Sequence, residues 1–208
     1  MRKNNFLGKF IVFEGHDGSG KTTQAEILAR RLKKSGREAL LTYEQTKGSV
    51  GRLISKALVK KIDLPAQSLQ LLFVADRVEH LEKEVIPALK SGKIVVSDRY
   101  FWSTVAYGSL RLDRDWLVSL HRYCLEPDLV VFIETSPTVC LERIKKRGEE
   151  RSVFEARSRL IRVDKTYRWL AKKFFERSVI INGGGEPAEV SKAVAESVSR
   201  RLKILNLK

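Results

Sequence analysis

Short apolar and β-branched runs recur along the chain, separated by longer mixed stretches. Each run covers five or six residues, which is the length of one strand, and carries few polar positions. Runs of this kind are typical of strands buried on both faces, as in a parallel sheet. The expected strands are residues 10–14, 39–43, 93–98, 129–134 and 178–182.

Helical periodicity fills the segments between these runs. Residues 67–90 are the clearest case, because apolar side chains return there every three or four positions. Strands that alternate with helices predict right-handed crossovers and a parallel sheet, with ligands at the carboxyl ends of the strands. The other expected helices are residues 20–35, 50–60, 113–124, 137–147 and 156–176.

Composition narrows the class of protein. The 208 residues, 43% of them hydrophobic, suffice for one α/β domain with a substantial core. No run reaches the roughly 18 apolar residues of a membrane span, and the amino terminus lacks a signal-peptide core, so we expect a soluble cytoplasmic protein. Cys124 and Cys140 have neither the number nor the spacing of a disulfide framework or metal site, so reduced thiols are expected.

The formal net charge is +15, which predicts an anionic ligand such as a nucleotide, a nucleic acid or an acidic membrane. The loop after the first apolar run favours a nucleotide among these three ligands. Residues 15–22, GHDGSGKT, match G-x-x-x-x-G-K-[ST] between an expected strand and an expected helix. Backbone N–H groups of such a loop surround a phosphate, so Lys21 is expected at the β- and γ-phosphates of a nucleoside triphosphate and Thr22 at Mg²⁺.

A second group of candidate residues follows the third run. Asp98 at the strand tip can orient Mg²⁺, and Arg99 beside it can bind a phosphate with its guanidinium fork. The alternative interpretation is an ion pair that closes the strand. The short chain also lacks a guanine-reading N-K-x-D segment, so a small-molecule kinase is favoured over a motor or a switch.

Three motifs in this order resemble the thymidylate kinase family: EGHDGSGKTTQ, FVADRVEH and DRYFWSTVAY. The resemblance runs from about residue 8 to the carboxyl-terminal helix. It implies a single three-layer α/β/α P-loop kinase domain over residues 1–208, with a five-stranded parallel sheet and a helical lid at about residues 143–156. It further implies phosphorylation of dTMP to dTDP by ATP and Mg²⁺ in dTTP biosynthesis, by a homodimer that has no membrane or nucleic-acid partner.

The resemblance implies roles for individual residues. The implied ATP-binding residues are Gly15, His16, Asp17, Gly18, Ser19, Gly20, Lys21, Thr22, Thr23, Arg143 and Gly185. The implied dTMP-binding residues are Asp17, Tyr43, Phe73, Arg77, Arg99, Ser103, Thr104 and Tyr107. The implied catalytic residues are Lys21, Arg99, Asp17, Arg147 and Arg151, and the implied metal-binding residues are Thr22 and Asp98.

Within this set, Phe73 is expected to stack on the base, Arg77 to read its edge, and Tyr107 to crowd the 2′ position. Gly18 stands where some members of the family carry an arginine, so the lid arginines are expected to supply that charge.

The chain also departs from the family pattern at several positions. Gln45 replaces a proline, which removes a fixed φ and whatever isomer the proline would set. Gly108 replaces a glutamine whose amide could contact the nucleoside, and His16 is an unusual imidazole inside the phosphate loop. Three alternatives therefore stay open: a monophosphate kinase of broader base choice that takes, for example, dUMP, a P-loop ATPase that binds nucleic acid, and a noncatalytic nucleotide sensor.

Overall fold

A computed structural model describes residues 1–146 and 153–204 of the protein. Its sheet is parallel and has the strand order β2-β3-β1-β4-β5. The central strand β1 lies between β3 and β4, with Val12 opposite Ser97 and Val130. The strands are β1 Phe10–Glu14, β2 Ala39–Tyr43, β3 Ile94–Asp98, β4 Leu129–Glu134 and β5 Ser178–Asn182.

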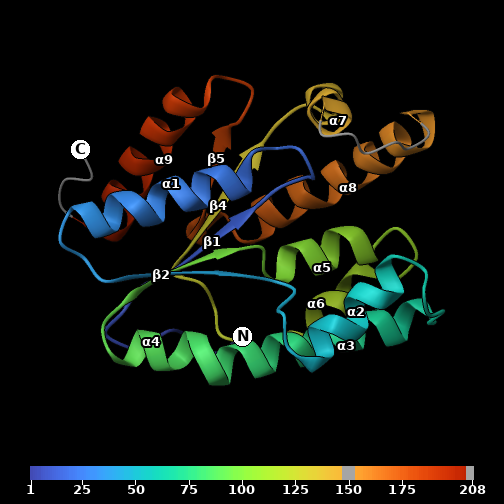
Figure 1. The fold of residues 1–208 in the computed structure, drawn as a ribbon, viewed down its shortest axis with the longest axis horizontal. Coiled ribbons are helices and arrows are strands. Elements are labelled where there is room, and N and C mark those ends of the chain that lie inside the picture. The colour runs from blue at the N-terminus through green and yellow to red at the C-terminus, as the bar shows by residue number, and fades with distance from the viewer. Residues whose placement is uncertain (147–152, 205–208) are drawn as a thin grey trace.

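Helices cover both faces of the sheet and confirm the three-layer α/β/α architecture. Figure 1 shows α1 and α9 together on one face, with α3, α4, α5 and α8 on the other. The helices are α1 Lys21–Lys34, α2 Ser49–Leu58, α3 Ala66–His80, α4 Ile86–Lys90, α5 Phe101–Gly108, α6 Arg114–Ser119, α7 Pro137–Lys146, α8 Val153–Lys173 and α9 Pro187–Leu202, with a π-helical turn η1 Leu81–Val85 and a 3₁₀ turn η2 Phe175–Arg177.

The core consists of one apolar cluster on each face of the sheet, and β1 contributes to both. Phe10 and Val12 pack with α4, α5 and α8, whereas Ile11 and Phe13 pack with α1 and α9. All four side chains are fully buried. Because successive strand residues point to opposite faces, a continuous apolar run is what this double burial requires. No described helix is both long enough and apolar enough to cross a membrane.

Some sequence predictions were wrong in detail. The edge strands β2 and β5 are only partly buried, because each has a neighbour on one side alone. The expected helix 113–124 ends at Ser119, where the backbone bonds tighten to three-residue spacing. The expected helix 67–90 is interrupted by η1, which ends two residues before Pro87, a residue that lacks the N–H a regular helix would use. Helix α5 was missed, since its residues are apolar nearly all round and show no helical stripe.

Candidate functional site

The phosphate loop joins β1 to α1 at the carboxyl edge of the sheet (Figure 1). Gly18 and Gly20 have φ angles of 81° and 94°, a region that strains any other residue. A Cβ on Gly18 would also lie 2.5 Å from the carbonyl oxygen of Cys140 in α7. The loop therefore has no room for an arginine at this position, and the supply of that charge by the lid arginines stays a prediction.

Lys21 is the first residue of α1 and lies beneath the loop. Its Nζ donates to the His16 carbonyl oxygen at 3.3 Å and lies 4.0 Å from the Asp17 carboxylate. Burial, and then the charge of Arg99, lowers the pKa of Lys21 to about 8. An anionic phosphate beside the ammonium group would favour its charged form.

Thr22 and Asp98 lie together, as predicted for the metal site. The Thr22 hydroxyl donates to Asp98 Oδ2, while the buried Oδ1 of Asp98 has no hydrogen-bond partner in the part of the chain that the structure describes. A hydroxyl beside an unpartnered carboxylate oxygen provides the oxygen ligands that Mg²⁺ prefers, and Mg²⁺ sites of kinases commonly use only one or two protein ligands. These two residues therefore fit Mg²⁺. Within residues 1–146 and 153–204, no cluster of three His, Cys, Asp or Glu residues could hold a metal.

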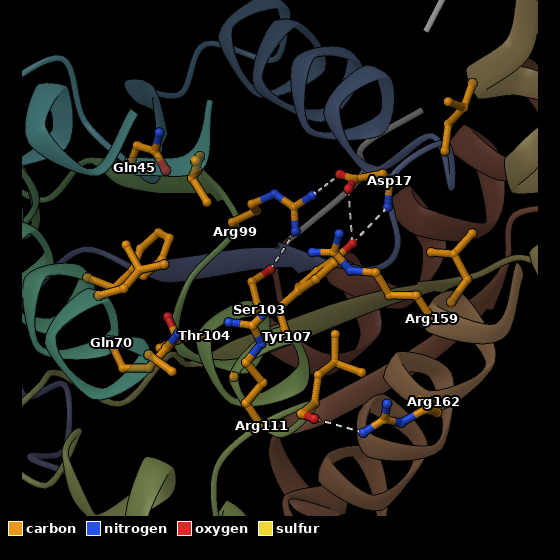
Figure 2. Close-up of a pocket in the computed structure, with 18 of the residues that line it drawn as sticks. Asp17, Gln45, Gln70, Arg99, Ser103, Thr104, Tyr107, Arg111, Arg159 and Arg162 are labelled. Atoms are coloured by element: carbon orange, nitrogen blue, oxygen red, sulfur yellow. Dashed lines mark hydrogen bonds and ion pairs between the residues drawn. The ribbon is translucent and has the colours of Figure 1, made fainter. Parts of the chain in front are cut away.

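Arg99 connects the phosphate loop to α5. Its Nη2 donates to Asp17 Oδ1 and its Nη1 donates to Ser103 Oγ at 2.7 Å (Figure 2). Tyr107 Oη donates to the other Asp17 oxygen at 3.2 Å. Arg99 has a φ of 76°, which is uncommon for a residue with a side chain and is enriched at functional sites. The structure thus brings together four residues that sequence analysis placed in one site.

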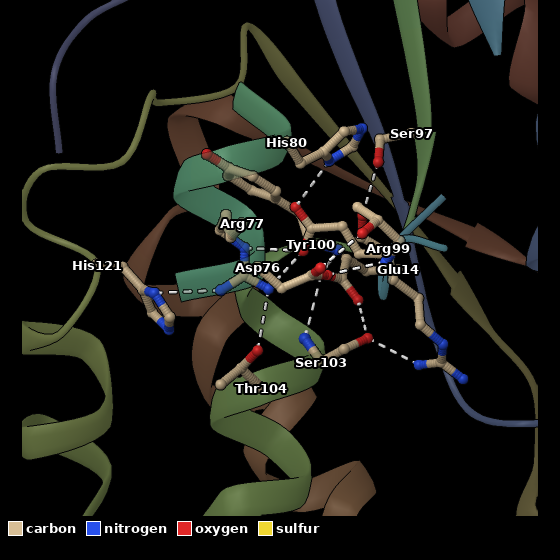
Figure 3. Close-up of polar contacts among 12 residues, drawn as sticks. Glu14, Asp76, Arg77, His80, Ser97, Arg99, Tyr100, Ser103, Thr104 and His121 are labelled. Carbon is tan, nitrogen blue, oxygen red and sulfur yellow. Dashed lines mark hydrogen bonds and ion pairs between the residues drawn. The ribbon is translucent and has the colours of Figure 1, made fainter. Parts of the chain in front are cut away.

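Glu14 is a fully buried carboxylate beneath this group. Its Oε1 accepts hydrogen bonds from the backbone N–H groups of Tyr100 (2.9 Å) and Ser103 (3.1 Å), and its Oε2 accepts one from the Ser103 hydroxyl at 2.6 Å (Figure 3). Burial raises the pKa of Glu14 to about 7, although the Ser103 hydrogen bonds and the Arg99 charge oppose the rise. Ser103, expected in the nucleoside pocket, therefore also links Glu14 to Arg99.

Arg77 lies in a second buried polar network (Figure 3). Its Nε and Nη2 donate to Glu44 Oε2 at 2.8 and 2.6 Å, and its Nη2 also donates to Thr104 Oγ1 at 3.0 Å. Its Nη1 donates to Nδ1 of His121 at 3.2 Å, since burial and then the Arg77 charge keep the pKa of that imidazole well below its usual range. Most of the guanidinium is therefore committed to protein partners, which sequence analysis did not foresee.

A cavity of roughly 2500 Å³ opens between these networks and the helices α3, α5, α7 and α8 (Figure 2). The Glu44–Gln45 peptide bond at its wall is cis, although Gln45 replaces the proline of the family pattern. Tyr43 is absent from the lining and is 43% exposed at the end of β2. The predicted dTMP-binding residues that line the cavity are Asp17, Phe73, Arg77, Arg99, Ser103, Thr104 and Tyr107.

Arg143 connects α7 to the donor side of the loop. Its Nη1 donates to the carbonyl oxygens of Ser19 (3.3 Å) and Gly183 (3.1 Å), so it joins the phosphate loop to the segment after β5. Gly185, the other predicted contact on this side, follows in that same segment. Arg147 and Arg151, the predicted lid arginines, lie outside the described residues.

The His16 ring was expected among the ATP-binding residues, but its polar partner lies in α8. The ring is fully buried and its Nε2 lies 3.0 Å from Oδ1 of Asp164 in α8, while its edge packs against Tyr167. Asp164 Oδ2 accepts a second hydrogen bond from Arg168 at 2.7 Å. The His16 side chain therefore joins the loop to α8, and only its carbonyl oxygen faces Lys21.

Sequence analysis missed several residues of the site. Glu14 opens the first recognised motif and Glu44 and Gln70 lie near recognised residues, but no local pattern marks their contacts with other elements. Arg159 approaches the cavity from α8, with its guanidinium carbon 5.7 Å from the centre of the Tyr107 ring. A charge-rich helix alone does not reveal which of its arginines turns inward.

The sequence is similar to a known protein family and to several of its members. A sequence model of the family described as thymidylate kinase matches residues 13–194. The probable thymidylate kinase of Pyrococcus horikoshii is 44% identical over 68% of this chain and 72% of its own length. The probable thymidylate kinase of Pyrococcus abyssi is 38% identical over 94% and 98%, and the thymidylate kinase of Orientia tsutsugamushi is 34% identical over 97% of both chains.

Proposed function

The chain belongs to the thymidylate kinase family, and from that premise we propose how its residues phosphorylate dTMP to dTDP with ATP. The observation that carries the assignment of roles is the Arg99–Asp17 ion pair, which connects the phosphate loop to the cavity wall. Of the alternatives, neither a nucleic-acid-dependent ATPase nor a noncatalytic sensor is favoured by any feature of the described residues.

On the donor side, the proposal assigns the triphosphate of ATP to the loop backbone and to Lys21. Thr22 and Asp98 would hold Mg²⁺, which when bound neutralises charge on the β- and γ-phosphate oxygens. Arg143 would lie near the adenine, as supported by its position between Ser19 and the segment after β5. This arrangement needs no covalent enzyme intermediate.

On the acceptor side, the proposal assigns the monophosphate of dTMP to Arg99 and the base to the cavity between α3 and α5. The hydrogen bond that Arg99 Nη1 donates to Ser103 Oγ supports a fixed orientation of the guanidinium, so little entropy would be lost when a phosphate binds. Because the phosphate oxygen of dTMP is already an adequate nucleophile near neutral pH, positioning and charge neutralisation are the main tasks of the site.

We extend the proposal to a homodimer in the cytoplasm. Apolar side chains on the outer surfaces of the neighbouring helices α2 and α3 support an interface there: Leu53 is 40% exposed, Leu71 51% and Val78 43%. Leu71 and Val78 are two turns apart and so share one side of α3. Light scattering on the purified protein tests this extension, and a monomer at micromolar concentration would contradict it.

A coupled assay across monophosphates tests the enzymatic proposal. Purified protein with ATP and Mg²⁺ should phosphorylate dTMP in preference to dCMP, and Lys21→Ala should abolish turnover because the loop then loses its cation. Equal efficiency for dTMP and dCMP would defeat the substrate assignment. ATP hydrolysis stimulated by DNA or RNA, without monophosphate phosphorylation, would reverse the functional assignment.

A further inference from the structure

One polar side chain in the wall of the cavity has a buried atom without a partner. Gln70 in α3 is 7% exposed and lines the cavity, and its buried Oε1 has no hydrogen-bond partner among the residues that the structure describes. Among the described residues that line the cavity, it is the only side chain with a buried oxygen or nitrogen in this condition. Buried acceptors almost always have partners, so an unpartnered oxygen beside a cavity indicates a ligand donor.

Gln70 lies in the part of the cavity wall that is proposed to hold the base. Gln70, Phe73 and Arg77 lie three and four residues apart, so they share one side of α3, and all three line the cavity. Arg77 already donates to the Thr104 hydroxyl of α5 at 3.0 Å. The neighbouring polar groups are thus satisfied by one another, while the Gln70 oxygen is not.

The glycine at position 108 allows Gln70 to reach this position. A Cβ on Gly108 would lie 3.0 Å from Gln70 Oε1 and 3.0 Å from both terminal methyl carbons of Leu117. Any larger side chain on α5 would therefore press on the amide. The family pattern has a glutamine at position 108, where this chain has glycine, and the amide beside that position here is the one of Gln70 in α3.

We propose that Gln70 is a specificity-determining residue whose Oε1 accepts a hydrogen bond from the N3–H group of a pyrimidine-2,4-dione base. The inference rests on the proposed function and deepens it. Thymine and uracil both carry this donor, whereas cytosine presents an unprotonated N3 and would set two acceptors against each other. Gln70 thus selects against cytosine and does not distinguish thymine from uracil.

Gln70→Met tests the inference, because methionine keeps the length of the side chain and removes the acceptor. We expect kcat/KM for dTMP and for dUMP to fall together by about tenfold to a hundredfold, the usual effect of losing one buried hydrogen bond. The preference for dTMP over dCMP should fall at least as much, while the ratio of dTMP to dUMP should stay at its wild-type value. An unchanged dTMP-to-dCMP ratio would overturn the inference.

The chain offers a matched control and a second variant. Gln24 is also a buried glutamine whose Oε1 has no partner in the described part of the chain, but it does not line the cavity, so Gln24→Met should leave the dTMP-to-dCMP ratio unchanged. Gly108→Ala should displace the Gln70 amide and lower the same ratio with Gln70 still present. If it leaves the ratio unchanged in a folded enzyme, the inference fails. Wild-type enzyme that does not phosphorylate dTMP would instead overturn the proposed function itself.

Discussion

Replacing Glu44 by glutamine should destabilise the protein strongly, because it leaves Arg77 buried without its counter-charge. The two side chains are 5% and 2% exposed, and Oε2 of Glu44 accepts from both Nε and Nη2 of Arg77. Burial alone would raise the pKa of Glu44, but the Arg77 charge and the His80 hydrogen bond hold it below its usual value. The carboxylate is therefore ionised, and glutamine removes a full charge while keeping the shape.

The size of the effect follows from this burial. Removing one partner of a buried ion pair costs about 3 to 5 kcal/mol, and glutamine retains one acceptor oxygen, so we expect a loss near the lower limit of about 3 kcal/mol. In a chain of this length that corresponds to a fall in Tm of roughly 6 to 12 °C. Urea denaturation at pH 7.5, followed by circular dichroism, measures the free energy of unfolding directly.

An exposed ion pair provides the control. Lys93 and Glu38 are 3.6 Å apart, with side chains 43% and 73% exposed, so Glu38→Gln should cost less than about 1 kcal/mol. Arg77→Met completes a double-mutant cycle with Glu44→Gln, and the coupling between the two positions should exceed about 1 kcal/mol. A Glu44→Gln loss no larger than that of Glu38→Gln, or a coupling near zero, would refute the reasoning.

Three further predictions concern buried titratable groups. Since the pKa of Lys21 is about 8 in the free protein, kcat/KM for ATP should decline above that pH, and a flat profile to pH 9.5 would contradict its role. The pKa of Glu14 is raised from 4.5 to about 7, so the fold favours its protonated form and the free energy of unfolding should fall by about 3 kcal/mol as pH rises from 4.5 to 8. In urea denaturation, the Glu14→Gln variant should not show this decline. The same dependence of the free energy of unfolding on pH in both proteins would disprove the prediction. His16→Phe keeps an aromatic ring but loses the hydrogen bond to Asp164, so the free energy of unfolding measured in urea should fall by about 1 to 3 kcal/mol. A fall below about 0.5 kcal/mol would show that the bond contributes little.

The fold could be predicted because its signals are local. Continuous apolar runs identify the strands, and the loop pattern at residues 15–22 identifies the start of α1. Helix α5 was missed because a helix buried on nearly every side has no polar stripe to reveal its period. The same local signals predicted Thr22 and Asp98 in one site, because Thr22 lies just after the loop that follows β1 and Asp98 ends β3, the strand paired with β1.

The polar partners of the site could not be predicted, because each contact joins elements far apart in sequence. Arg77 was expected to face the base, and nothing near it in sequence shows that Glu44 and His121 take up most of its donors. His16 was unexplained until α8 brought Asp164 against its ring. Pairing of this kind depends on the tertiary packing of three or four elements, and hydrophobic periodicity carries no information about it.

Tyr107 shows how such packing changes the role of a residue. Sequence analysis assigned its ring to crowding the 2′ position of the sugar, yet the ring also lies 5.6 Å from the guanidinium carbon of Arg99 and 5.7 Å from that of Arg159. Its hydroxyl donates to Asp17, whose backbone N–H donates back to it at 3.3 Å. A cation over an aromatic ring gains about 0.5 to 2 kcal/mol, so one tyrosine helps to hold an arginine from the end of β3 and another from α8. The side chain predicted to limit the sugar therefore also contacts two of the arginines that line the cavity, and its position fixes their spacing.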